Sequence, residues 1–136
     1  LLNWLFHRCP QAHVVLDHMG KPNITQNGML EWQQGIMRIA AYPNVSCKLS
    51  GLPTEADWQN WTKEQLIPWI LHAIDIFGTE RCLFGGDWPV VNLAGGYTRW
   101  RKCVEESLQL LPISAQQRSA ITAQNARRIY SLSSGG

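Results

Sequence analysis

Residues 12–17 (AHVVLD), 44–49 (NVSCKL) and 81–85 (RCLFG) are three short apolar runs, each followed at once by polar or glycine residues. Continuous apolar runs of this length are typical of strands buried on both faces of a parallel sheet. The chain between and after them shows helical periodicity, in the order strand, helix, strand, helix, strand, helix, helix. This alternation predicts βαβ units and therefore an α/β fold.

Capping signals mark the ends of the expected helices. Thr62 and Ser114 are each followed three residues later by glutamine, which is the spacing of a capping box. Gly78 stands where a C-terminal cap glycine is expected, and Pro43 ends the first helix. The expected helices, with caps, cover residues 30–41, 62–78, 97–111 and 114–130.

The spacing of the strand ends agrees with two architectures. His18, Lys48 and Asp87 follow one another at intervals of 30 and 39 residues. An eight-unit (β/α)8 barrel averages about 31 residues per unit. A doubly wound sheet fits the same alternation, so spacing alone does not choose between them.

Composition excludes several classes of protein. The 136 residues suffice for one domain, and 45% hydrophobic with 16% charged residues exclude a disordered chain. The net charge is only +2 and the basic residues are scattered along the chain, which argues against a nucleic-acid-binding surface. No apolar run approaches the roughly 20 residues of a membrane span. The chain begins with Leu1 rather than Met, so we expect a fragment and draw nothing from the lack of a leader.

The four cysteines contain no C-x-x-C pair, which argues against a structural zinc site. Cys47 and Cys82 lie inside apolar runs, where a buried reduced thiol is expected rather than a disulfide. Reduced thiols favour a cytoplasmic location.

Ionisable residues stand at the ends of all three expected strands. Asp17 and His18 follow the first, Lys48 lies near the end of the second, and Asp87 follows the third. In parallel α/β folds the carboxyl ends of the strands carry the chemistry. Because a buried charge is costly unless it is paired, these groups are expected to be partners for one another.

Each of these residues also has a structural interpretation. Asp17 can cap the following loop, and His18 can be a core histidine bonded to a carbonyl group. Lys48 can pair with a carboxylate on a neighbouring strand instead of contacting a substrate. Asp87 can cap the next turn, although Gly85 and Gly86 before it favour a close backbone approach or a sharp turn, which a cap does not need.

Three tryptophans follow strand ends and are candidates for lining a pocket. Trp58 and Trp61 lie in the loop after the second strand, and Trp88 directly follows Asp87. The other tryptophans are expected to pack in the core or between helices.

Four motifs occur in order: DHMGKP at 17–22, CKLSGL at 47–52 with TEADW at 54–58, FGGDWPV at 84–90 and NARRIY at 125–130. Together they resemble the amidohydrolase-related family of TIM-barrel hydrolases, and most closely its sugar lactonases of the L-fuconolactonase and L-rhamnono-lactonase type. The resemblance covers about residues 10–132. Gly86 departs from the pattern, which has serine there, and we expect the change to be tolerated.

The resemblance implies a partial (β/α)8 barrel, with residues 1–136 as the C-terminal portion of one domain carrying strands six to eight. It implies that Asp87 is the general base that activates water for attack on a sugar-acid lactone. His18 and Asp87 would hold one divalent metal, Zn or Mn, if the reaction uses one. Lys48, Trp58 and Trp88 would contact the substrate.

The resemblance also implies an H-x-H pair on the first barrel strand, and this stretch of sequence contains none. Three strands cannot close a barrel, so the N-terminal half of the barrel is the expected partner and the fragment alone is expected to be inactive. The alternatives are a non-catalytic remnant that folds with a partner or not at all, and a small open α/β domain that binds an anion. The absence of a glycine-rich phosphate loop argues against a nucleotide as that anion.

Overall fold

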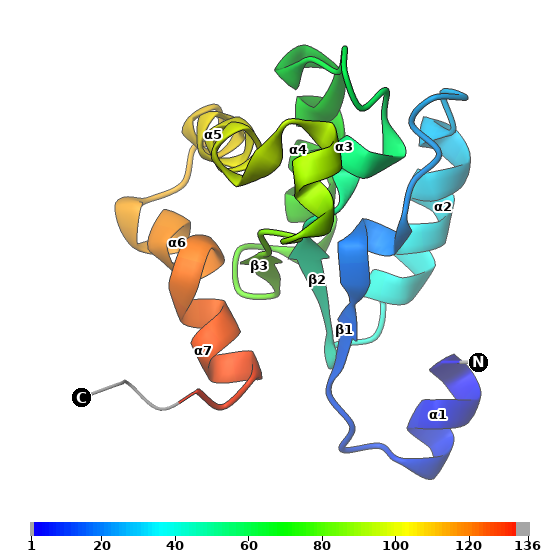
Figure 1. Ribbon diagram of the computed structural model, residues 1–136. Helices are drawn as coiled ribbons and strands as arrows, with labels where there is room; N and C mark the ends of the chain where they lie inside the picture. Colours follow the sequence, from blue (N-terminus) through cyan, green and yellow to red (C-terminus); the bar gives the residue numbers. More distant parts are fainter. Residues whose placement is uncertain (1, 133–136) are drawn as a thin grey trace.

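A computed structural model describes residues 2–132. Strands β1 (Val14–Leu16), β2 (Val45–Leu49) and β3 (Cys82–Phe84) form one parallel sheet in the order β1-β2-β3 (Figure 1). Each predicted apolar run therefore contains a strand. The middle strand, β2, separates β1 from β3, so residues that follow the two outer strands can meet only across its end.

Helices α2 (Met29–Ala40) and α4 (Lys63–Phe77) are the two crossover connections of the sheet. Both pack against β2 and against each other (Figure 1). The Thr62 hydroxyl accepts a hydrogen bond from the Gln65 N–H at 3.3 Å and caps α4, and Gly78 ends it with a φ of 77°. The predicted βαβ alternation and the cap positions Thr62 and Gly78 are confirmed. Only the hydroxyl half of the predicted capping box forms at Thr62, whereas Ser114 and Gln117 make both bonds of theirs.

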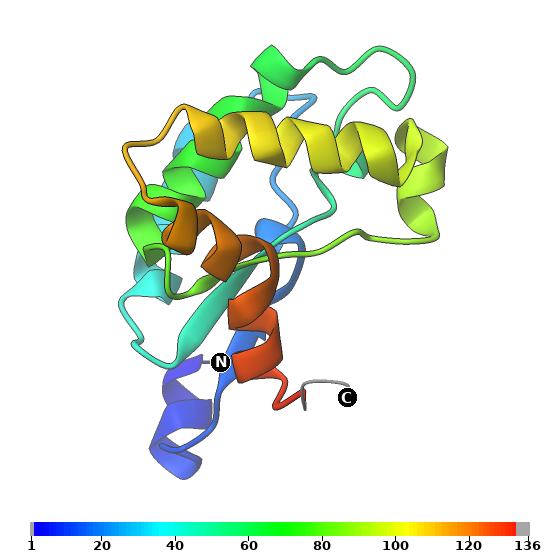
Figure 2. The same ribbon diagram turned by 90° about the vertical axis from the view of Figure 1, so that its left-hand side faces the viewer.

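Helix α5 (Gly96–Gln109) follows the sheet and packs against α4 in the outer layer (Figure 2). The last predicted helix is interrupted. A π-helical turn at Ala120–Gln124 separates α6 (Ala115–Ser119) from α7 (Asn125–Ile129). The expectation of one regular helix over residues 114–130 is therefore wrong in its middle.

The structure adds short elements that the sequence did not predict. Helix α1 precedes the sheet, and the ring of its Phe6 stacks on Tyr42 with centroids 5.0 Å apart. These elements are α1 (Leu2–Arg8), a 3-10 turn (Asp17–Gly20), α3 (Leu52–Glu55) and a second 3-10 turn (Val90–Ala94).

The core lies between the sheet and its helices. Val45, Cys47 and Leu49 of β2 are fully buried. All three residues of β1 are partly exposed, so burial on both faces is wrong for this strand. β1 lies at an edge of the sheet with no described strand beside it, whereas β3, at the other edge, is contacted by residues 120–129 of the C-terminal segment.

The cysteines behave as the sequence suggested. All four are free, and Cys9 alone is exposed. Burial raises the pKa of the Cys47 thiol to about 12, so this thiol stays protonated at neutral pH. Between residues 2 and 132, no helix has both the length and the apolar character needed to cross a membrane. The cytoplasmic location stays a prediction.

Candidate functional site

The site is built from the loops that follow the three strands. Because the strands are parallel, their carboxyl ends lie along one edge of the sheet. The predicted residues Asp17, His18, Lys48 and Asp87 meet there, as expected. Ser50, at the end of β2, belongs to the same group and was missed, because a single serine after a strand carries no distinctive signal.

Asp17 and Lys48 form an ion pair across the first two strands. Lys48 Nζ lies 2.6 Å from Asp17 Oδ1, and the same oxygen accepts a hydrogen bond from the His18 backbone N–H at 3.0 Å. Partial burial acts to raise the pKa of Asp17, but the Lys48 hydrogen bond and the charges of His18 and Lys48 outweigh it and lower the pKa. Asp17 therefore pairs with Lys48, and its side chain makes no cap hydrogen bond to the 3-10 turn, whose N-cap is Leu16.

The His18 ring lies between two carboxylates. Its Nδ1 is 2.8 Å from Ser50 Oγ and 3.7 Å from Asp87 Oδ1, and its Nε2 is 3.4 Å from Asp17 Oδ2. The ring is hydrogen bonded to a hydroxyl group rather than to the carbonyl group that the structural interpretation expected. The His18 backbone is left-handed, with φ 51° and ψ 35°. Such a conformation costs about 1–3 kcal/mol in a residue with a side chain, and it is concentrated at functional sites.

Asp87 shares this left-handed conformation, with a φ of 54°. Its side chain is only 11% exposed, and its Oδ1 lies 3.7 Å from Nδ1 of the His18 ring. The cap of the following 3-10 turn is Pro89, so the interpretation of Asp87 as a helix cap is wrong. The Asp87 carboxylate is therefore directed at the group of strand-end residues.

The two glycines before Asp87 permit close packing. A Cβ atom on Gly85 would lie 3.0 Å from the Lys48 side chain and 3.0 Å from Ser50 Cβ. A Cβ atom on Gly86 would lie 2.9 Å from the Tyr97 ring, which fills the space that a serine there would need. Neither glycine has a positive φ, so of the two predicted roles the close approach applies and the sharp turn does not.

The three candidate tryptophans have different environments. Trp61 is 2% exposed and donates its indole N–H to the Ala94 carbonyl at 2.7 Å. It lines a cavity of about 240 Å³ beside Arg99 and Lys63, which is separate from the strand-end site. Trp88 is 75% exposed and Trp58 is 47% exposed. Both remain free to contact a ligand.

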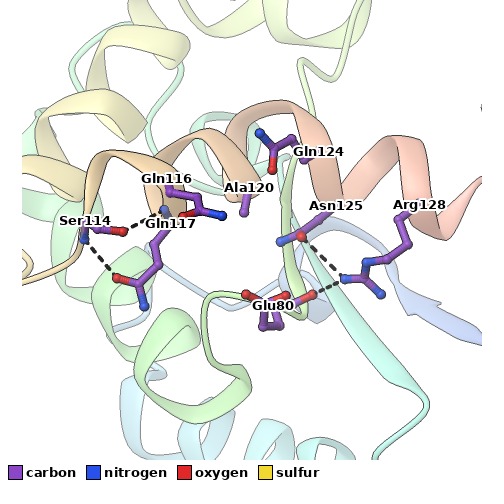
Figure 3. Close-up of a pocket in the computed structure, with 8 residues that line it drawn as sticks. All are labelled: Glu80, Ser114, Gln116, Gln117, Ala120, Gln124, Asn125 and Arg128. Atoms are coloured by element: carbon purple, nitrogen blue, oxygen red, sulfur yellow. Dashed lines mark hydrogen bonds between the residues drawn. The ribbon is translucent and has the colours of Figure 1, made fainter. Parts of the chain in front are cut away.

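A polar cavity of about 550 Å³ lies at the opposite end of β3 (Figure 3). Glu80 and Arg128 are among its lining residues, and none of the strand-end residues lines it. The cavity is therefore separate from the candidate site.

The donor atoms near His18 do not complete a metal site by themselves. Between residues 2 and 132, no group of three or more histidine, cysteine, aspartate or glutamate side chains is placed to hold a metal. A zinc site normally has three or four protein ligands. His18 and Asp87 would therefore need further donors from other residues, and the predicted metal stays a prediction.

Comparison with known proteins gives the family. The model of the family described as Amidohydrolase matches residues 1–132. The chain belongs to this amidohydrolase family. The resemblance carried by the four sequence motifs is thereby confirmed.

Two curated relatives are sugar lactonases. The L-fucono-1,5-lactonase of Burkholderia multivorans is 39% identical over 131 residues, which are 89% of this chain and 44% of that protein. The L-fucono-1,5-lactonase of Burkholderia ambifaria is 34% identical over 128 residues, covering 92% of this chain and 43% of that protein. This amidohydrolase chain thus spans less than half the length of these relatives.

A solved structure shares the fold. The crystal structure of an amidohydrolase from Burkholderia multivorans with bound Zn superposes with a TM-score of 0.85 and is 36% identical. The match covers 96% of this chain and 49% of that one. The three parallel strands and their helices are thus consistent with part of a larger amidohydrolase barrel.

Proposed function

We propose that residues 1–136 are the C-terminal portion of a lactonase-type hydrolase, in which β1, β2 and β3 are strands six, seven and eight of a (β/α)8 barrel. The 43–44% coverage of the lactonase relatives supports this proposal, as does the open edge of β1. The remaining strands, which would close the barrel, come from other residues in the same polypeptide or in a partner. Residues 1–136 alone lack these strands, which would form the other side of the site, and are expected to be inactive.

Asp87 is the proposed general base. The single observation that carries this role is the meeting of Asp87 Oδ1 and His18 Nδ1 at 3.7 Å, over the end of β2. The carboxylate takes a proton from water as the water oxygen bonds to the lactone carbonyl carbon. When the ring C–O bond breaks, the proton passes to the departing alkoxide oxygen, so Asp87 returns to its starting state.

His18 is the proposed ligand for the substrate oxygen or for a metal. A divalent ion, such as the Zn bound in the related crystal structure, would polarise the carbonyl group and lower the pKa of bound water. Such an ion would need donors besides His18 and Asp87.

The remaining residues are proposed to bind the substrate. Lys48 uses one of its three N–H donors on Asp17, which leaves two for a substrate oxygen. Trp88 and Trp58 present large exposed ring surfaces, against which the apolar face of a sugar ring can pack.

The test replaces the carboxylate of Asp87 with an amide group of nearly the same shape that cannot act as a base. Asp87→Asn in the natural polypeptide that contains these residues should abolish hydrolysis of L-fucono-1,5-lactone, and far-UV circular dichroism should stay unchanged. The matched control is Asp75→Asn, because Asp75 lies on the exposed surface of α4. Turnover in Asp87→Asn equal to that of the control would refute the role of Asp87.

The alternative is a non-catalytic remnant that folds only with a partner. It is favoured by the same coverage of less than half of the relatives. Urea unfolding of residues 1–136 tests the incompleteness that both hypotheses share, because a half barrel without its partner should unfold with little cooperativity. Lactone hydrolysis by the natural polypeptide that contains these residues distinguishes the two, because only the remnant should lack turnover. A steep single transition would show independent folding and weaken both the half-barrel proposal and the partner-dependent remnant.

A further inference from the structure

We propose that Ser50 is a positioning residue whose buried hydroxyl group holds the His18 ring with Nδ1 toward Asp87. Ser50 is 0% exposed, and its Oγ lies 2.8 Å from His18 Nδ1. The inference rests on the proposed function, because it assigns Ser50 a role through His18 and Asp87.

The contact between Ser50 and His18 is strongly favoured by burial. A hydroxyl group removed from water costs about 1–3 kcal/mol unless it is hydrogen bonded. The only side-chain partner of Ser50 Oγ among the described residues is His18 Nδ1. The hydroxyl donates when Nδ1 is unprotonated and accepts when Nδ1 carries a hydrogen, so the bond persists in either tautomer.

Gly51 supports the same ring from a second direction. A Cβ atom on Gly51 would lie 2.8 Å from His18 Nδ1 and 2.8 Å from His18 Cβ. The ring therefore occupies the space that the side chain of any other residue at position 51 would need. Gly51 also has a φ of 72°, which favours glycine. Ser50 and Gly51 together form a cradle for the ring, at the end of the strand that separates β1 from β3.

The cradle selects one of two ring orientations. A half-turn of the imidazole would exchange Nδ1 with a carbon atom, and would remove both the Ser50 bond and the approach of Nδ1 to Asp87 Oδ1. The same turn would move Nε2 away from Asp17 Oδ2, now 3.4 Å distant. Ser50 therefore acts on Asp87 through His18 and does not need to touch the substrate.

The chain contains a matched control. Ser46, on the same strand, is 1% exposed and its Oγ lies 3.0 Å from His13 Nε2. This pair repeats the serine–histidine contact between β1 and β2, but at the other end of the strands. Ser46→Ala and Ser50→Ala thus remove the same chemical group from the same kind of contact, and only the second lies at the site.

The first experiment is NMR of the natural polypeptide that contains these residues, with 15N-labelled histidine and long-range 1H–15N spectra of the rings. Ser50→Ala should shift the His18 ring nitrogens and leave His13 unchanged, and Ser46→Ala should do the reverse. Gly51→Ala should also shift His18, because the added Cβ atom would lie 2.8 Å from His18 Nδ1 and must displace the ring. Unchanged His18 signals in both Ser50→Ala and Gly51→Ala would overturn the cradle.

The second experiment measures lactone hydrolysis by the natural polypeptide that contains these residues. Ser50→Ala should lower kcat roughly three- to tenfold, the equivalent of one lost hydrogen bond, with little change in KM. Ser46→Ala should leave kcat unchanged. If Asp87→Asn abolishes turnover but Ser50→Ala matches Ser46→Ala, the positioning role fails and the proposed function stands. If Asp87→Asn retains turnover, both fail, and the NMR result still decides whether the cradle exists.

Discussion

Asn125 offers a sharp test of how the last helix is attached to the sheet. Its side chain is 2% exposed, and its amide nitrogen donates to the Thr79 carbonyl at 2.6 Å and to the Cys82 carbonyl at 2.7 Å. Its amide oxygen accepts from Arg128 at 3.3 Å. One side chain on α7 thus satisfies two backbone acceptors at the start of β3.

The expected loss in Asn125→Ala follows from these bonds. Two hydrogen bonds contribute about 0.5–1.5 kcal/mol each, and a buried carbonyl group left without a partner adds a desolvation penalty of about 1–3 kcal/mol. Cys82 is fully buried, so water cannot readily replace the amide at its carbonyl group. We expect Asn125→Ala to lower the free energy of unfolding by about 2–4 kcal/mol, a large part of the roughly 5–15 kcal/mol of a typical domain.

Equilibrium urea unfolding, followed by circular dichroism, measures this difference in the same polypeptide for all variants. The control is Gln124→Ala, because Gln124 is the exposed neighbour and, among residues 2–132, its side chain bonds only to Ser119 Oγ, at 3.1 Å. The control should stay within about 0.5 kcal/mol of the parent. If Asn125→Ala lowers the free energy of unfolding no more than the control does, these hydrogen bonds do not stabilise the fold.

Two further predictions concern the strand-end site. Since the pKa of Asp17 is lowered in the folded state, its ionised form stabilises the fold above the ordinary pKa of an aspartic acid, and this contribution is lost as the pH falls through the lowered value. Lys48→Met removes the hydrogen bond, so an NMR titration should find the Asp17 carboxylate protonating at higher pH; an unchanged midpoint would contradict the ion pair. Gly86→Ser should destabilise the fold by about 1–3 kcal/mol through overpacking against Tyr97. A Tyr97→Ala background should remove most of that loss in urea melts, and equal losses in both backgrounds would show that Tyr97 is not the obstacle.

Several parts of the structure were predictable because they depend on local patterns. Short apolar runs separated by helical periodicity specify βαβ units whatever the rest of the chain does. The strands at Val14–Leu16, Val45–Leu49 and Cys82–Phe84 follow from this rule. Parallel strands place their carboxyl ends along one edge, so the gathering of His18 and Asp87 could be foreseen from their positions after strands.

Other features could not be read from local patterns. The π-helical turn at Ala120–Gln124 lies within a sequence of ordinary helical periodicity. It immediately precedes Asn125, whose amide group bonds to the carbonyl groups of Thr79 and Cys82, more than 40 residues earlier in the chain. The burial of Trp61 is likewise decided by a distant group, the Ala94 carbonyl.

The sequence by itself determined the strands, the crossover helices and the family to which the chain belongs, because these depend on periodicity and on short motifs. It left open whether Lys48 would pair with a carboxylate, and it assigned no role to Ser50. The tertiary structure decided both, through the ion pair with Asp17 and the contact with His18. The physical reason is that side-chain partners are set by the register of β1 against β2, which joins residues about 30 positions apart, and no local pattern records that register.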